Sequence, residues 1–135
     1  MRWLPIVVLA VSLSCGAFDG AAQAQTAAAT FHQQFNDERY GDIYDQASAA
    51  FKQSTTRDNL AQLLQAVHRK LGTFSKGDVT FTNVFSSTGS GTTVSLTYTS
   101  EYAEGRATED FKFAIGNGRA FLVAYNINSP TLILR

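Results

Sequence analysis

The sequence predicts an α+β domain in which N-terminal helices pack on a curved, four-stranded antiparallel meander sheet. Apolar residues recur at helical spacing up to Gly72 and at alternating spacing after it. Clusters of glycine, asparagine and serine then divide the second half of the chain into strand-length segments. With 135 residues, 44% of them hydrophobic, the chain is long enough for one domain with its own core.

The first 24 residues have the pattern of an export signal. Arg2 precedes an uncharged apolar run from Trp3 to Phe18, and Ala22-Gln23-Ala24 matches the small-x-small pattern that signal peptidase cuts. The apolar run is shorter than the ~20 residues needed to span a bilayer. We therefore expect export to the periplasm or secretion. The predicted division is a signal peptide at 1–24, a flexible leader at 25–30 and a single domain at 31–135.

The only cysteine offers a second interpretation of this segment. The stretch Val11-Ser12-Leu13-Ser14-Cys15-Gly16 resembles a bacterial lipobox, in which the chain is cut before the cysteine and the thiol is acylated. It departs from the usual box, which prefers leucine where this chain has Ser12. The site at Ala24 fits its own consensus better, so a lipid anchor on Cys15, which would make an outer-membrane lipoprotein, is the alternative. In both interpretations the folded domain forms no disulfide.

Three helices are predicted before the change of period. The first covers 28–38. The second presents an apolar face made of Ile43, Ala47, Ala50 and Phe51. The third has the best-defined ends, because Thr55 and Asp58 resemble a capping box and Gly72 supplies a C-cap. Its apolar stripe consists of Leu60, Leu63, Leu64, Val67 and Leu71.

The strands begin where Val79, Phe81 and Phe85 alternate with polar residues. A long strand follows from Thr92 to Tyr102, and Glu104-Gly105 is a candidate two-residue turn. This turn predicts a register that places nearly all apolar side chains on one face. The predicted pairs are Tyr102 with Ala107, Ser100 with Glu109, Tyr98 with Phe111, Leu96 with Phe113, and Val94 with Ile115.

The last hairpin turns at Gly116-Asn117-Gly118 and allows two registers. A two-residue loop would put Phe121, Val123, Tyr125 and Ile127 on the polar face. A three-residue loop that pairs Ile115 with Arg119 instead brings Phe121 opposite Phe113, Val123 opposite Phe111 and Tyr125 opposite Glu109. Each large side chain moved inward contributes ~1.5–3 kcal/mol, so burial favours the three-residue loop.

The segment Phe35-Asn36-Asp37-Glu38-Arg39-Tyr40-Gly41-Asp42-Ile43-Tyr44, with Ala47, Phe51 and the helix up to Gly72, carries a family resemblance. It is similar to small exported bacterial domains of unknown function built on the cone-shaped nuclear-transport-factor-two-like fold, which is also cystatin-like in shape. The resemblance implies a pocket between sheet and helices and an accessory or ligand-binding role without shared catalytic residues. The inhibitory Gln-x-Val-x-Gly motif of cystatins is missing.

Composition and motifs exclude several functions. The 11 basic residues balance 11 acidic ones, which argues against binding to nucleic acid and against electrostatic attachment to a membrane. There is no CxxC, HExxH or P-loop motif. His32 and His68 lie on different predicted helices and cannot complete a zinc site alone, and we expect His32 to be solvated. The sequence therefore predicts no metal and no cofactor.

Glu109 is the one candidate for chemistry. In the predicted register it is the only carboxylate on the apolar face, with Tyr98, Ser100, Tyr102 and Tyr125 around it. In a cone fold, a partly buried carboxylate there could act as a ligand anchor or as a base. Its position near the end of a strand, where sheet faces usually meet water, favours a solvated carboxylate instead.

These observations predict an exported, non-catalytic domain that binds a small apolar ligand or an envelope protein. The alternative is a pocket enzyme of the isomerase or hydrolase type that uses Glu109 as its base. A homodimer that packs sheet on sheet is a further arrangement that the sequence allows, because Leu122 and its neighbours make the last strand apolar on both sides.

Overall fold

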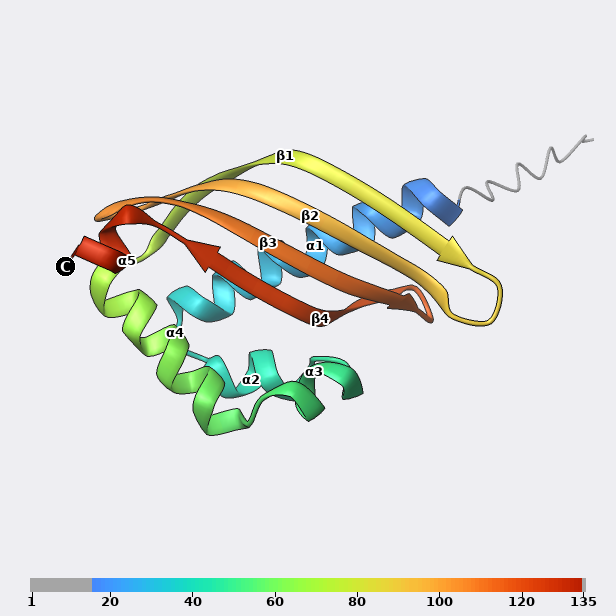
Figure 1. The fold of residues 1–135 in the computed structure, drawn as a ribbon, viewed down its shortest axis with the longest axis horizontal. Helices are drawn as coiled ribbons and strands as arrows, with labels where there is room; N and C mark the ends of the chain where they lie inside the picture. The colour runs from blue at the N-terminus through green and yellow to red at the C-terminus, as the bar shows by residue number, and fades with distance from the viewer. Residues whose placement is uncertain (1–15, 135) are drawn as a thin grey trace, which may run out of the picture.

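The computed structural model describes residues 16–134 as helices packed against one curved sheet (Figure 1). Strand order β1-β2-β3-β4 confirms the predicted α+β class and the four-stranded antiparallel meander. The helices are α1 (Gly16–Asn36), α2 (Tyr40–Asp45), α3 (Ala49–Ser54), α4 (Arg57–Leu71) and α5 (Pro130–Leu134). The strands are β1 (Phe74–Ser87), β2 (Gly91–Tyr102), β3 (Gly105–Gly116) and β4 (Arg119–Asn128).

Helix α1 is longer than predicted and crosses the inner face of the sheet. Residues 25–30, expected to form a flexible leader, lie within this helix and pack on the core, so that expectation is wrong. The reason is a row of small residues one turn apart, Gly20, Ala24 and Ala28, which lets the helix approach the strands; both alanines are 0% exposed. Arg2 and Cys15, which carry the signal and lipobox predictions, lie outside the described residues.

The predicted second helix is two short helices, and the predicted third begins one residue later than expected. Ser48 separates α2 from α3 and caps α3 with its hydroxyl. The cap of α4 is Thr56 and not Thr55, because Thr56 is extended and its hydroxyl accepts the N–H of Asn59 at 3.1 Å. Gly72 ends α4 as predicted, with φ of +76°.

The β2–β3 hairpin differs from the predicted register by two residues. The turn is Ala103-Glu104, so that Tyr102 pairs with Gly105 and Glu109 lies opposite Tyr98. Tertiary contacts select this turn: the N–H groups of Ala103 and Glu104 donate to the carbonyls of Thr73 and Leu71, each at 2.9 Å. A shift of two residues keeps every side chain on its face, so the predicted inner face is correct although the pairing is not.

The β3–β4 hairpin combines features of both predicted registers. Its loop is the two-residue Asn117-Gly118 turn, with φ of +52° and +72°, and the three-residue loop is therefore wrong. A bulge opposite the Lys112/Phe113 step then reverses the alternation in β4. The bulge returns Tyr125 and Ile127 to the inner face, so the favourable turn does not prevent their burial.

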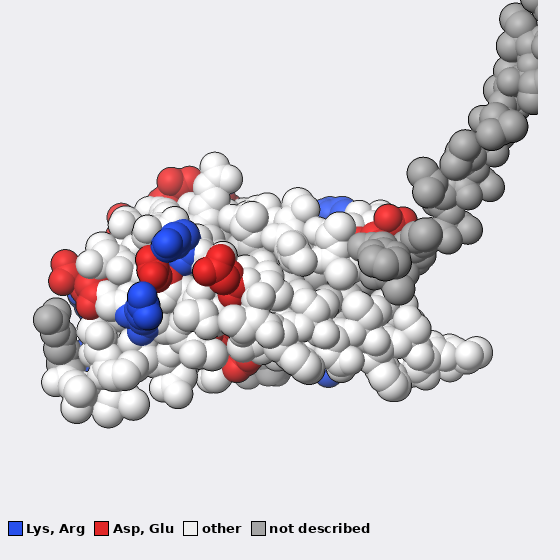
Figure 2. Space-filling view, turned by 90° about the horizontal axis from the view of Figure 1, so that it is seen from above, with Lys and Arg blue, Asp and Glu red and all other residues white. Residues whose placement is uncertain are grey.

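The face of the sheet turned away from α1 carries few large apolar side chains. Phe81 and Phe85 on β1 are 58% and 62% exposed, because a bulge next to Val79 sets both on this outer face. Figure 2 shows charged side chains gathered toward the end of the molecule that carries α5, with a mostly uncharged surface toward the β1–β2 loop. None of the helices within residues 16–134 combines the length and hydropathy of a membrane-spanning helix.

Candidate functional site

Glu109 is a fully buried carboxylate, 0% exposed, on the inner face of β3. Its Oε1 accepts hydrogen bonds from the Ser100 hydroxyl at 2.5 Å and from His32 Nε2 at 2.9 Å. Its Oε2 accepts the hydroxyls of Tyr102 at 2.9 Å and Tyr125 at 2.5 Å. We call these five residues the Glu109 cluster. Both carboxylate oxygens therefore have two donors each.

Four elements bring the cluster together. Ser100 and Tyr102 alternate on β2 next to β3, and Tyr125 reaches the same face of β4 because of the bulge. His32 comes from α1, and its ring stacks on Phe74 with the ring centroids 3.6 Å apart. Phe74 is itself fixed, since the Asn36 side chain pairs with both its N–H and its carbonyl.

The electrostatics of the cluster keep the carboxylate charged. Burial by itself would raise the pKa of Glu109, but the hydrogen bond and positive charge of His32, together with the Ser100 and Tyr125 hydrogen bonds, lower it below its ordinary value. Burial and the nearby Glu109 charge raise the pKa of Tyr102 and Tyr125, so both remain hydrogen-bond donors. The cluster is a buried anion surrounded by donors.

The predicted surroundings of Glu109 are partly confirmed, and the ligand-binding role predicted for Glu109, Tyr98, Ser100, Tyr102 and Tyr125 stays a prediction. Ser100, Tyr102 and Tyr125 contact Glu109 as expected, whereas Tyr98 lies on the same face and packs its ring against His32 without a hydrogen bond in the described part of the chain. The expectation of a solvated Glu109 is wrong. So is that of a solvated His32, which is 4% exposed. The helical spacing between His32 and the buried residues of α1 was the sequence signal that could have predicted its burial.

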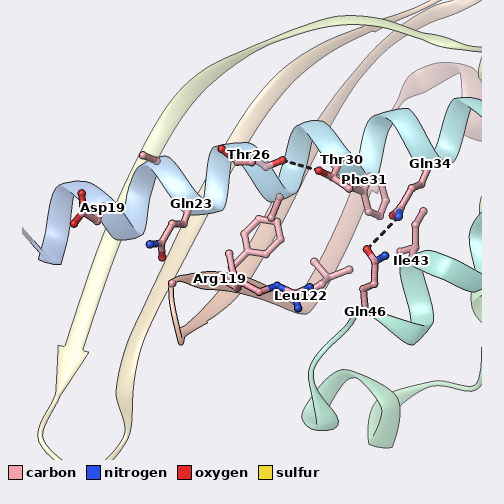
Figure 3. A pocket seen from close by; sticks show the side chains of 15 residues that line it. Asp19, Gln23, Thr26, Thr30, Phe31, Gln34, Ile43, Gln46, Arg119 and Leu122 are labelled. Carbon is pink, nitrogen blue, oxygen red and sulfur yellow. Dashed lines mark hydrogen bonds between the residues drawn. The ribbon is translucent and has the colours of Figure 1, made fainter.

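A separate pocket of about 380 Å³ lies between α1, α2 and β4 (Figure 3). We call it the α1–β4 pocket. Its apolar lining includes Ala27, Phe31, Ile43, Phe113, Ala120 and Leu122. Its polar and charged lining includes Asp19, Gln23, Thr26, Thr30, Gln34, Gln46 and Arg119. Figure 3 shows the α1 side chains on one wall and the β3–β4 hairpin on the other.

The polar groups of this pocket are incompletely paired. Gln34 Nε2 donates to Gln46 Oε1 at 3.1 Å across the mouth between α1 and α2. The Thr30 hydroxyl donates to the Thr26 carbonyl at 3.1 Å. The Oε1 atom of Gln23 is buried and has no hydrogen-bond partner among residues 16–134. Buried polar atoms are nearly always paired with protein or water, so this acceptor is open to a water molecule or to a ligand donor in the pocket.

Phe31 separates the two sites. Its ring lines the α1–β4 pocket and also packs on Tyr125 and Phe111, with centroid distances of 4.6 and 5.1 Å. None of the five residues of the Glu109 cluster lines this pocket. Within residues 16–134, no three His, Cys, Asp or Glu side chains are placed to hold a metal ion.

Comparison with known families matches a region that holds the Glu109 cluster and part of the α1–β4 pocket. Residues 27–125 match the family model described as "Protein of unknown function (DUF4019)". The chain belongs to the DUF4019 family. The match confirms the prediction of a domain of unknown function, and it contains the whole Glu109 cluster of this DUF4019 domain. No curated protein matches the chain. The nuclear-transport-factor-two-like resemblance stays a prediction.

Proposed function

We propose that this DUF4019 protein is an exported, non-catalytic binding domain whose ligand site is the α1–β4 pocket. The observation that supports this most is the apolar floor of the pocket, formed by Phe31, Phe113 and Leu122. In the precursor, and in a chain that begins at Cys15, the unpaired Gln23 Oε1 adds an acceptor to the wall. The pocket volume of about 380 Å³ lies in the range of pockets that hold one small ligand, ~300–1,000 Å³. Apolar surface supplies affinity there and the few polar groups orient the ligand.

In this proposal Glu109 holds α1 on the sheet and does not act as a base. A general base needs a lone pair within reach of the proton that it removes. Both Glu109 oxygens already accept two hydrogen bonds, and Phe31 stands between the cluster and the pocket. Its lowered pKa also makes the carboxylate a weaker base. The geometry therefore favours the binding function over the alternative of a pocket enzyme.

Export is the second part of the proposal and rests on the pattern of residues 1–24. The intact mass of the protein isolated from its own cell envelope tests it. A chain that starts at Gln25 supports a soluble periplasmic or secreted domain, and one that starts at an acylated Cys15 supports the lipoprotein alternative. The unprocessed mass in the envelope fraction would contradict both.

The binding function can be tested with a neutral apolar probe, N-phenyl-1-naphthylamine, whose fluorescence rises in apolar surroundings. We expect saturable binding to the full chain. Ala120→Trp fills the pocket from β4 and should weaken binding at least tenfold. Ala124→Trp is the matched control, because Ala124 is exposed on the same strand and pairs with Lys112 on the outer face.

Two outcomes would overturn the proposal. One is the absence of saturable probe binding to a chain that is folded by circular dichroism. The other is equal loss of binding in both tryptophan variants, which would place the probe elsewhere on the domain. Loss in Ala120→Trp alone supports the α1–β4 pocket as the site.

A further inference from the structure

We infer that the α1–β4 pocket receives an extended peptide segment, which pairs with the outward backbone groups of Ala120 at the edge of β4. This inference rests on the proposed function, because it names the ligand class of the same pocket. It fits the predicted envelope protein partner, whose chain would supply the segment. The argument depends on the direction of the β4 backbone groups and on the polar wall of α1 opposite them.

β4 is an edge strand, paired with β3 on one side only. The two-residue turn makes Gly116 and Arg119 the pair that flanks the loop, and this pair exchanges its backbone hydrogen bonds within the hairpin. Direction alternates along an antiparallel strand, so Ala120 and Leu122 turn their N–H and C=O groups outward. An independent contact agrees with this: the Leu122 carbonyl accepts the N–H of Ser48 at 2.9 Å.

The contact from Ser48 shows that the edge already accepts a backbone donor. The chain turns away from β4 directly after Ser48, because Ser48 caps α3 and that helix begins there. Ala120, two residues earlier and lining the pocket, has no backbone hydrogen bond outside the sheet within residues 16–134. The pocket therefore presents one outward N–H and one outward carbonyl at the spacing of a strand edge.

The opposite wall, on α1, offers polar side chains to a bound peptide. Gln23, Thr26, Thr30 and Gln34 recur every three or four residues, so they lie on one face of α1. In the precursor, and in a chain that begins at Cys15, the unpaired Gln23 Oε1 can accept an N–H. A strand placed about 4.8 Å from β4 would direct alternate side chains toward Phe31 and Ile43 in the apolar lining.

Peptide chemistry fits these groups better than a hydrocarbon does. A hydrocarbon that displaced water from the pocket would leave the Ala120 backbone groups and Gln23 Oε1 unpaired, at a cost of about 1–3 kcal/mol each. A peptide backbone offers a donor and an acceptor on both of its edges at the required repeat. Strand addition of this kind takes affinity from main-chain hydrogen bonds and specificity from alternate side chains.

The test uses the full chain and the capped peptide acetyl-Thr-Val-Thr-Val-Thr-amide, followed by competition against the neutral probe and by amide hydrogen exchange. We expect the peptide to displace the probe and to slow exchange at the Ala120 N–H. The same peptide N-methylated at alternate residues cannot pair along an edge, and it should bind at least tenfold more weakly. Ala120→Pro removes the edge N–H and should weaken peptide binding tenfold.

The outcomes separate the two proposals. If the probe binds but the unmethylated peptide does not displace it, the strand-addition inference is overturned and the pocket function stands. Equal binding of the methylated and unmethylated peptides also overturns it. If the probe itself does not bind, the proposed function fails. The methylated peptide acts on the unmodified protein, so the test does not depend on how Ala120→Pro folds.

Discussion

The two polar regions that face each other across Phe31 differ in how completely they are paired. In the Glu109 cluster, four donors meet the two oxygens of one carboxylate, and no cluster residue lines the α1–β4 pocket. In the pocket, Gln23 Oε1 and the outward backbone of Ala120 have no partner in the described chain. His32 and Gln34, on the same helix and two residues apart, belong to these opposite regions. Complete hydrogen bonding characterises a structural anchor, whereas unpaired polar groups characterise a binding surface.

The largest effect should come from the anchor itself. Glu109→Gln removes the buried charge and leaves His32 and the hydroxyl donors facing an amide, which should lower the free energy of unfolding by about 3–5 kcal/mol. Urea unfolding followed by circular dichroism measures this. Asp110→Asn is the control, because Asp110 is the exposed neighbour on the other face of β3. Equal effects of the two substitutions would show that the cluster contributes nothing special.

Acid should weaken the same anchor. The pKa of Glu109 is lower in the folded protein than its ordinary value of 4.5, so the unfolded chain takes up the proton first as the pH falls. The stability due to this group is complete above pH 4.5 and decreases as the pH falls toward the folded pKa. Urea midpoints between pH 3 and 7 measure it. Glu109→Gln should have a flatter profile in the acid range, and a profile parallel to the parent's would contradict the assignment.

Two tyrosines on the inner face sharpen the comparison further. Tyr125→Phe removes a hydrogen bond to a charged group and should cost about 1.5–3 kcal/mol. Tyr98→Phe removes a hydroxyl that makes no hydrogen bond in residues 16–134 and should cost less than about 0.5 kcal/mol. Urea unfolding of both variants gives the difference. A larger loss for Tyr98→Phe would mean that the hydroxyl network is not the source of stability.

A small effect is expected on the pocket side of α1. Gln34→Leu removes the hydrogen bond to Gln46, whose side chain can then bond to water, so the free energy of unfolding should change by less than about 1 kcal/mol. His32→Leu, two residues earlier on the same helix, removes the partner of the buried Glu109 carboxylate and should lower the free energy of unfolding by about 3 kcal/mol or more. Thermal unfolding of the pair checks this order, and a reversed order would break the distinction between the two regions.

The sequence predicted the fold and the members of the inner face, because both follow from the alternation of side chains. It predicted Ser100, Tyr102 and Tyr125 around Glu109 even though the β2–β3 pairing was two residues out, since such a shift preserves faces. It missed the actual turn because contacts from Leu71 and Thr73, far away in the chain, select Ala103-Glu104. Local turn preference carries no information about such contacts.

The partner of His32 and the bulge in β4 were beyond local patterns. The spacing of His32 from the buried residues of α1 indicates an inward-facing side chain, but its partner lies 77 residues away in the sequence. The bulge reconciles a favoured Asn-Gly turn with the burial of Tyr125, and a choice between uniform registers excludes that solution. The pocket has no motif, because its walls come from four elements, α1, α2, β3 and β4, that only the fold brings together.

If the proposed export signal is cut after Ala24, the continuity of α1 through this residue sets the order of cleavage and folding. The Ala24-Gln25 bond lies inside a helix, and Ala24 is 0% exposed, so a folded chain withholds this bond from a peptidase that needs an opened segment. Cleavage there must therefore precede folding. It would also remove Gly20, over which Val94 and Ile115 now pack, and Gln23 from the pocket wall. Precursor and mature chain would then present different surfaces to the same partner.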